Sequence, residues 1–192
     1  STVGRLDAPP ARAHGRRCVR ELLDALVALV RHVDIAGGVH RQRRLTADGI
    51  ETTFGTNHLG HFLLTHLLRD LIVRSAPARV VTVASMVHRW GTLDFNDLGL
   101  ERGYGLVKAY AKSKLANVLF ANELARQLAG TGVTSNSLHP GGVATNIWSG
   151  APRWARPFIA IFVRPRLISV EAGAATIVQL AASADLESVT GL

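Results

Sequence analysis

The chain has 192 residues, of which 47% are hydrophobic and 19% charged, with a formal net charge of +8. This length and composition predict one folded domain and exclude an intrinsically disordered chain. A single cysteine, Cys18, excludes an internal disulfide framework. No apolar run approaches the ~20 residues that span a bilayer. Residues 1–10 lack the apolar segment of a secretory signal, so we expect a cytoplasmic protein without a transmembrane span.

The positive charge is spread along the chain, and no nucleic-acid-binding module accompanies it. We therefore expect no nucleic-acid partner. Of the 22 basic residues 19 are arginine, whereas the three lysines fall in one seven-residue window, at Lys108, Lys112 and Lys114. This window is the part of the charge that suggests a local chemical role.

Hydrophobic spacing and turn residues predict short strands that alternate with helices. In chain order we expect a helix at 21–31, a short strand at 33–36, a polar turn at 45–49, a helix at 56–71, a strand at 79–84, a loop at 91–105, a helix at 109–129, a strand at 133–138, a loop from 140, an irregular stretch at 148–165 and a helix at 169–182. This alternation is typical of an α/β protein with a parallel sheet.

Three of these elements carry further expectations. The continuous β-branched run at 79–84 predicts a strand buried on both faces. The helix at 109–129 is apolar almost all round in its middle, which predicts heavy burial. The strand at 133–138 contains Ser135, Asn136 and Ser137 and is therefore expected to be weak.

Tyr110 and Lys114 lie four residues apart at the start of the long helix, which places both side chains on one helix face. An ammonium group beside a phenol favours the phenolate and lowers the pKa of the phenol. Such a tyrosine can exchange a proton with an alcohol near neutral pH. The alternative is an ordinary surface pair. Tyr104 and Lys108 have the same spacing, but glycines flank Tyr104 and predict a loop there.

Two further polar residues stand at the ends of predicted elements. Ser85 directly follows the strand at 79–84, where a hydroxyl can hydrogen-bond a substrate oxygen or simply cap the next turn. Asn57 lies near a helix start, where asparagine is also a common N-cap.

Other kinds of site have less support. His58, His61 and His66 lie on one helix, but His58 and His66 are too far apart to bind one metal ion, so we expect no metal site. Ser85 is preceded by Val83 and Ala84 and no G-x-S-x-G motif is present, which argues against a hydrolase.

Four segments together resemble the short-chain dehydrogenase/reductase family, with the closest likeness to its retinol-dehydrogenase-like branch: Asn57–Thr65, Ser75–Ser85, Tyr110–Asn117 and His139–Gly141. The resemblance implies a Rossmann-like doubly wound parallel sheet with helices on both faces, here lacking its first strands. It also implies hydride transfer between NADP or NAD and the alcohol or carbonyl group of a lipophilic, retinol-like small molecule.

The resemblance implies a role for each matched residue. Tyr110 would be the general acid and base, and Lys114 would lower its pKa and hold the nicotinamide ribose. Ser85 would orient the substrate oxygen, and Asn57 would hold a water that links Lys114 to solvent. The remaining cofactor contacts would come from Pro140, Gly141, Val143, Thr145, Ala36, Gly37 and Asp7.

The sequence departs from the family pattern at the phosphate-binding turn. The T-G-x-x-x-G-x-G motif, whose glycines let the backbone approach the cofactor pyrophosphate, occurs nowhere in the 192 residues. The family's N-N-A-G segment keeps only Ala36 and Gly37. We therefore expect this 192-residue chain to bind NAD(P) weakly or not at all.

On this interpretation residues 1–192 form a single, incomplete NAD(P)-binding Rossmann domain. Its parts are a catalytic core at 32–147, a substrate lid at 148–168 and a C-terminal helix and tail at 169–192, and a homodimer through the helix at 110–129 is expected. The alternative is a catalytically silent remnant of the family that acts as an interaction module. The lid residues fit either a lipophilic substrate or ordinary packing.

Overall fold

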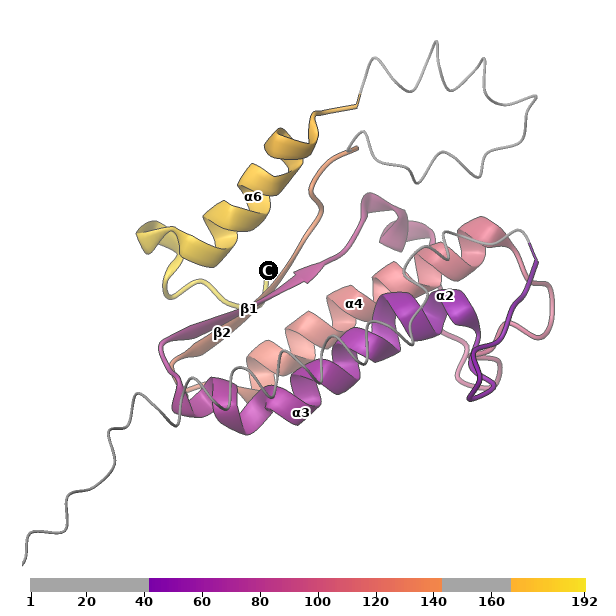
Figure 1. Ribbon diagram of the computed structural model, residues 1–192, viewed down its shortest axis with the longest axis horizontal. Coiled ribbons are helices and arrows are strands. Elements are labelled where there is room, and N and C mark those ends of the chain that lie inside the picture. Colours follow the sequence, from indigo (N-terminus) through magenta and orange to yellow (C-terminus); the bar gives the residue numbers. More distant parts are fainter. Residues whose placement is uncertain (1–41, 143–166) are drawn as a thin grey trace, which may run out of the picture. The chain divides into compact units, whose positions relative to one another are not determined.

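The computed structural model describes residues 42–142 and 167–192 (Figure 1). They belong to one unit, Gly37–Leu192. The predicted helix at 21–31, the strand at 33–36 and the irregular stretch at 148–165 lie outside the described residues.

The first helical run is longer than expected and contains a wide turn. It consists of α2 (Thr52–Phe54), a π-helical turn η1 (Gly55–Leu59) and α3 (Gly60–Arg74). Glu51 caps its start, since its two carboxylate oxygens accept from the backbone N–H groups of Thr53 and Phe54, each at 2.8 Å. The predicted helix at 56–71 is therefore confirmed in type, but its cap lies five residues earlier than position 56.

Two parallel strands form the sheet of the described part of the chain. These are β1 (Ala78–Val83) and β2 (Val133–Leu138), paired from Ala78 with Val133 to Val83 with Leu138. The short helix η2 (Met86–Trp90), a loop and the long helix α4 (Leu106–Gln127) connect them. Both predicted strands and the predicted loop between Gly91 and Gly105 are confirmed.

The burial of β1 differs from the sequence expectation. In β1 only Thr82 is buried and Val83 is exposed, so the prediction of burial on both faces is wrong. In β2 the first four residues are all buried. Two of their polar side chains bond within the protein: Ser135 Oγ donates to the Ala121 carbonyl at 3.0 Å, and Asn136 Nδ2 donates to the Val189 carbonyl at 2.7 Å. The buried Thr134 hydroxyl has no hydrogen-bond partner among the described residues. The prediction that this strand is weak concerns its stability and stays a prediction.

The C-terminal residues lie along β2. The Gly191 N–H donates to the Ser135 carbonyl at 2.9 Å, and the Ser137 N–H donates to the Leu192 carbonyl at 2.6 Å. The Leu192 N–H donates to Asn136 Oδ1 at 3.1 Å. These bonds satisfy part of the outer edge of β2 and explain why a polar strand can be buried there.

Most of the buried residues of helix α4 are small. The buried positions are Ala109, Ala111, Lys112, Ser113, Ala116, Asn117, Ala121, Leu124 and Ala125. Small side chains let the helix approach its neighbours closely, whereas Leu119 is 48% exposed. The predicted long helix is thus confirmed, and of its large apolar residues Leu124 is buried. Gly130 and Gly132 follow it with φ of +79° and +78°, as expected for glycines that end a helix.

Helix α4 lies beside α3 (Figure 1) and packs against both strands. The Phe62 and Phe120 rings join the two helices, with centroids 5.5 Å apart. A core of Leu124, Leu128 and Val133 fills the space between helix and sheet.

The last helix, α6 (Val170–Ala182), begins where the sequence predicts it. Ser169 caps it by accepting from the Ala172 N–H, and Glu171 lies in its first turn. Arg79 on β1 donates to the Leu180 carbonyl of α6 at 3.3 Å. A short helix, η7 (Ala184–Leu186), follows.

Candidate functional site

Ser85 stands two residues after β1 ends and is 8% exposed. Its Oγ accepts from the Val87 N–H at 3.4 Å, so it caps η2. It also shares a side-chain hydrogen bond with Tyr110. Of the two alternatives that the sequence left open, the cap is confirmed, and the hydrogen bond from Ser85 to a substrate oxygen stays a prediction.

Tyr110 and Lys114 lie one turn apart on α4 and face the end of β1. Lys114 Nζ donates to the Val83 carbonyl at 3.1 Å and lies 5.6 Å from the centroid of the Tyr110 ring. Both side chains are half-buried. The structure therefore brings together Ser85, Tyr110 and Lys114. The spacing predicted that the last two share a helix face, and the resemblance implied that Ser85 lies beside them.

The electrostatics of this pair differ from the expectation. Burial raises the pKa of the Tyr110 phenol, and the hydrogen bond with Ser85 lowers it to a smaller extent. Burial also lowers the pKa of the Lys114 ammonium group. The prediction that Lys114 depresses the pKa of Tyr110 is not met in this arrangement, because desolvation is the largest influence on each pKa and favours the neutral form of both groups.

Asn57 lies in the π-helical turn and not at the helix start, so the N-cap alternative is wrong and Glu51 takes that role. Its Nδ2 donates to Ser113 Oγ at 3.2 Å, and Ser113 Oγ donates to the Tyr110 carbonyl at 2.8 Å. Asn57 is thereby connected to the helix that carries Tyr110 and Lys114. Single π-turns within helices are frequent at functional sites.

Asn117 is a component of this cluster to which the sequence analysis assigned no role. It is 1% exposed, and its Nδ2 donates to the carbonyls of Asn57 at 3.0 Å and Val83 at 3.3 Å. Its position is seven residues after Tyr110 and three after Lys114, so the three side chains share one helix face. This spacing is the sequence feature from which a role for Asn117 in the site could have been predicted.

Tyr104 and Lys108 do not form a second site of this kind. Tyr104 precedes α4, which begins at Leu106, and burial raises the pKa of its phenol. Lys108 is exposed on the helix. The expectation that only Tyr110 and Lys114 share a helix is confirmed.

Pro140 and Gly141 follow β2, near the carboxyl end of the sheet where open α/β folds bind ligands. Gly141 has a φ of +93°, and a Cβ there would lie 2.7 Å from Ile168 Cδ1, so only glycine fits this bend. The other predicted cofactor contacts, Asp7, Ala36, Gly37, Val143 and Thr145, lie outside the described residues.

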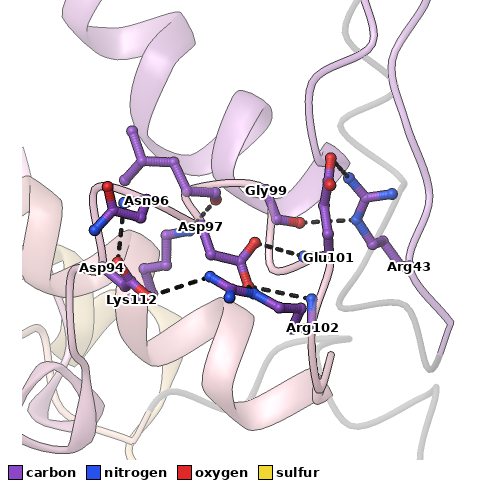
Figure 2. A network of polar contacts seen from close by, with 9 residues as sticks. Arg43, Asp94, Asn96, Asp97, Gly99, Glu101, Arg102 and Lys112 are labelled. Atoms are coloured by element: carbon purple, nitrogen blue, oxygen red, sulfur yellow. Dashed lines mark hydrogen bonds and ion pairs between the residues drawn. The ribbon is translucent and has the colours of Figure 1, made fainter.

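The loop before α4 is held by a polar network (Figure 2). Asp97 accepts from the backbone N–H groups of Glu101 at 2.7 Å and Arg102 at 3.1 Å, and Arg43 Nε donates to the Gly99 carbonyl at 2.8 Å. Lys112, which is 1% exposed, donates to the Leu98 carbonyl and lies 4.8 Å from the centroid of the Phe54 ring. This network fixes the loop against the helix that bears Tyr110.

Neither a metal site nor a membrane span is found in the part of the chain that the structure describes. Residues 42–142 and 167–192 contain no cluster of three or more His, Cys, Asp or Glu side chains arranged to hold a metal ion. No helix within these ranges has the length and apolar character needed to cross a bilayer.

The short-chain dehydrogenase family model matches residues 13–156. The chain belongs to this family. It is 43% identical over 191 residues to Retinol dehydrogenase 14 of Mus musculus, and this alignment covers 98% of this chain and 57% of that relative. It is 46% identical over 158 residues to the WW domain-containing oxidoreductase of Homo sapiens, and this alignment covers 77% of this chain and 37% of that relative.

Solved structures agree with this family fold. A crystal structure of an uncharacterized protein from Mycobacterium paratuberculosis is 45% identical and covers 58% of this chain and 42% of that chain, with a TM-score of 0.50. A short-chain dehydrogenase/reductase of unknown function from Caenorhabditis elegans, solved with cofactor, is 22% identical and covers 72% of this chain and 50% of that chain, with a TM-score of 0.56. The chain spans about half the length of the family members that it matches.

Proposed function

We propose that this protein is an NAD(P)(H)-dependent oxidoreductase that interconverts the alcohol and carbonyl forms of a lipophilic, retinol-like small molecule. Family membership and the likeness to Retinol dehydrogenase 14 support the reaction type and the substrate class. The observation that carries the proposal is the meeting of Ser85, Tyr110 and Lys114 at the end of β1.

The donors at this site suit a nicotinamide ribose. The ammonium group of Lys114 has three hydrogens, and its bond to the Val83 carbonyl uses one of them. Hydroxyl groups of a ribose are suitable acceptors for the others. When bound, NAD(P)(H) supplies or accepts the hydride, and the choice between NAD and NADP is left to measurement.

The chain's own residues supply the proton and hold the substrate oxygen. Burial raises the pKa of Tyr110, so its phenol is protonated near neutral pH and can donate a proton to the substrate oxygen during carbonyl reduction. The Ser85 hydroxyl shares a hydrogen bond with Tyr110 and can hold the same oxygen. In alcohol oxidation Tyr110 accepts the proton, and hydrogen-bond donation from Ser85 stabilises the phenolate.

We extend the proposal to a homodimer through the helix at 110–129. Leu119 on α4 is 48% exposed, and Phe62, Leu63 and Leu67 on the neighbouring α3 are 45%, 44% and 69% exposed. Apolar side chains gathered on adjacent helices favour association with a second copy.

The test measures cofactor-dependent oxidation of retinol and of shorter primary alcohols at millimolar NAD⁺ and NADP⁺. It uses the 192-residue protein and, where the coding DNA upstream of Ser1 continues in frame, the longer product. We expect Tyr110→Phe to lower kcat by about 10²–10⁴-fold, the usual contribution of a general acid or base. Tyr104→Phe is the matched control and should leave kcat unchanged. Equal loss in both variants, or turnover by Tyr110→Phe at the wild-type rate, contradicts the assignment.

A further inference from the structure

The buried amide of Asn117 joins three elements of the site. From α4 it reaches the carbonyl of Asn57 in η1 and the carbonyl of Val83 at the end of β1. The Val83 carbonyl also accepts from Lys114 Nζ at 3.1 Å. Asn117 and Lys114 therefore share one acceptor, and the position of that acceptor depends on both.

The partners of Asn117 determine the orientation of its amide. A carbonyl oxygen can only accept a hydrogen bond, so the atom that faces the carbonyls of Asn57 and Val83 must be the NH₂ group. The amide oxygen then faces His58, whose Nδ1 lies 3.0 Å from Asn117 Oδ1. Because this oxygen can only accept, His58 must carry its proton on Nδ1.

The surroundings of His58 are consistent with a neutral ring. The side chain is half-buried, and burial is the largest influence on its pKa, which it lowers. The hydrogen bond with Asn117 raises this pKa to a smaller extent, and the neighbouring His61 lowers it by the smallest amount. The imidazole packs among aromatic rings, with centroid distances of 5.1 Å to Phe54, 6.1 Å to Phe62 and 6.2 Å to Phe120. These contacts fix the plane of the ring and therefore the direction of Nδ1.

We propose that His58 and Asn117 are positioning residues of the active site. The imidazole orients the Asn117 amide, and that amide holds the carbonyls of Asn57 and Val83 at fixed places relative to Lys114. The pair thus sets where the ammonium group lies beside Tyr110. The catalytic purpose of this arrangement rests on the oxidoreductase function proposed above. The hydrogen bonds of His58 and Asn117 are independent of that function.

The first experiment needs no turnover. Long-range ¹H–¹⁵N correlation spectra of the imidazoles in the 192-residue protein at pH 7 report which ring nitrogen carries the proton. We expect His58 to be neutral and protonated on Nδ1, the minor form of a free neutral imidazole. A spectrum with His58 protonated on Nε2 alone would mean that the amide of Asn117 is oriented the other way, and it would overturn the proposal.

The second experiment separates positioning from folding. His58→Phe keeps the aromatic packing and removes the donor, and Asn117→Asp keeps the shape and removes both donors to the carbonyls. His58→Gln restores a donor of similar reach. The matched control is His66→Phe, since His66 is exposed on α3 and stacks on Phe62 with centroids 6.3 Å apart.

We expect His58→Phe and Asn117→Asp to lower kcat by about 10- to 100-fold, because a misplacement of about 1 Å costs up to this much, with KM for the alcohol nearly unchanged. His58→Gln should recover part of kcat, and His66→Phe should match the wild type. A wild-type kcat in folded His58→Phe overturns the proposal. If neither the 192-residue protein nor the longer product turns over substrate, the proposed function fails and the catalytic purpose of the pair fails with it, while the imidazole spectrum still decides whether the pair exists.

Discussion

Lys112→Met tests whether a buried cation holds the loop of Figure 2 in place. Lys112 is 1% exposed, and three contacts compensate its charge: the Leu98 carbonyl, the Phe54 ring and the attraction of Glu51, Asp97 and Asp94. Burial is nevertheless the largest influence on its pKa and lowers it. The variant therefore removes favourable contacts and an unfavourable desolvation at the same time.

The contacts are expected to outweigh the desolvation. A hydrogen bond to a charged group contributes about 1.5–3 kcal/mol, and a desolvated cation–π contact about 2 kcal/mol. Methionine recovers the packing on Phe54 but leaves the Leu98 carbonyl without this donor and removes the attraction of the Lys112 charge for the buried Glu51. We expect a net loss of about 2–3 kcal/mol in the free energy of unfolding, or roughly 4–12 °C in Tm for a chain of this size.

The measurement is urea unfolding followed by circular dichroism, with Lys108→Met as the matched control. Lys108 is exposed on the same helix one turn earlier, so its variant should change the free energy of unfolding by less than about 0.5 kcal/mol. If Lys112→Met is as stable as the wild type or more stable, the desolvation of the ammonium group exceeds all three contacts, as happens for some buried ion pairs, and the reasoning is refuted.

Three further predictions concern the cofactor, the assembly and pH. Calorimetry of the 192-residue protein with NADPH should show weak binding or none, because the sequence lacks the glycine motif that cradles the pyrophosphate; tight stoichiometric binding would contradict this. Leu119→Arg should shift sedimentation from dimer to monomer, whereas a monomeric wild type would disprove the dimer. Hydrogen bonds from Arg126 and Gln127 lower the pKa of the exposed Glu123 to about 2, so the stabilisation from its ionised form should be complete above the ordinary value of 4.5 and decline as the pH falls through about 2. A carboxyl ¹³C titration of Glu123 with a midpoint near 4.5 would show that these bonds do not persist in solution.

The order and type of the described elements could be predicted from the sequence because they depend on local patterns. Spacing of apolar residues located α3, α4 and α6, and β-branched residues located β1. The start of the first helix was missed because its cap is Glu51, a residue whose two oxygens reach the Thr53 and Phe54 N–H groups, whereas the sequence favoured Asn57 as the polar residue near the start.

Burial could not be predicted in the same way, because it depends on which segments meet. The polar strand β2 is buried since Ser135 and Asn136 find partners in Ala121 and Val189, residues distant in the chain. The apolar strand β1 is only half-buried among the described residues. In α4 most of the buried residues are small, and of the large apolar side chains Leu124 is buried whereas Leu119 is exposed; which of them is buried depends on the neighbouring segments that pack against the helix.

The same distinction applies to the site. Spacing along α4 predicted that Tyr110 and Lys114 share a face, and this is a property of any helix. The pKa of Tyr110 depends instead on the water excluded by surrounding segments, and burial there raises it. Burial disfavours both phenolate and ammonium, so a charged pair at this site needs hydrogen bonds to each member. Ser85 bonds with the tyrosine and the Val83 carbonyl accepts from the lysine. Both of these groups belong to the end of β1, and α4 and β1 must therefore keep their relative position for the site to change its protonation.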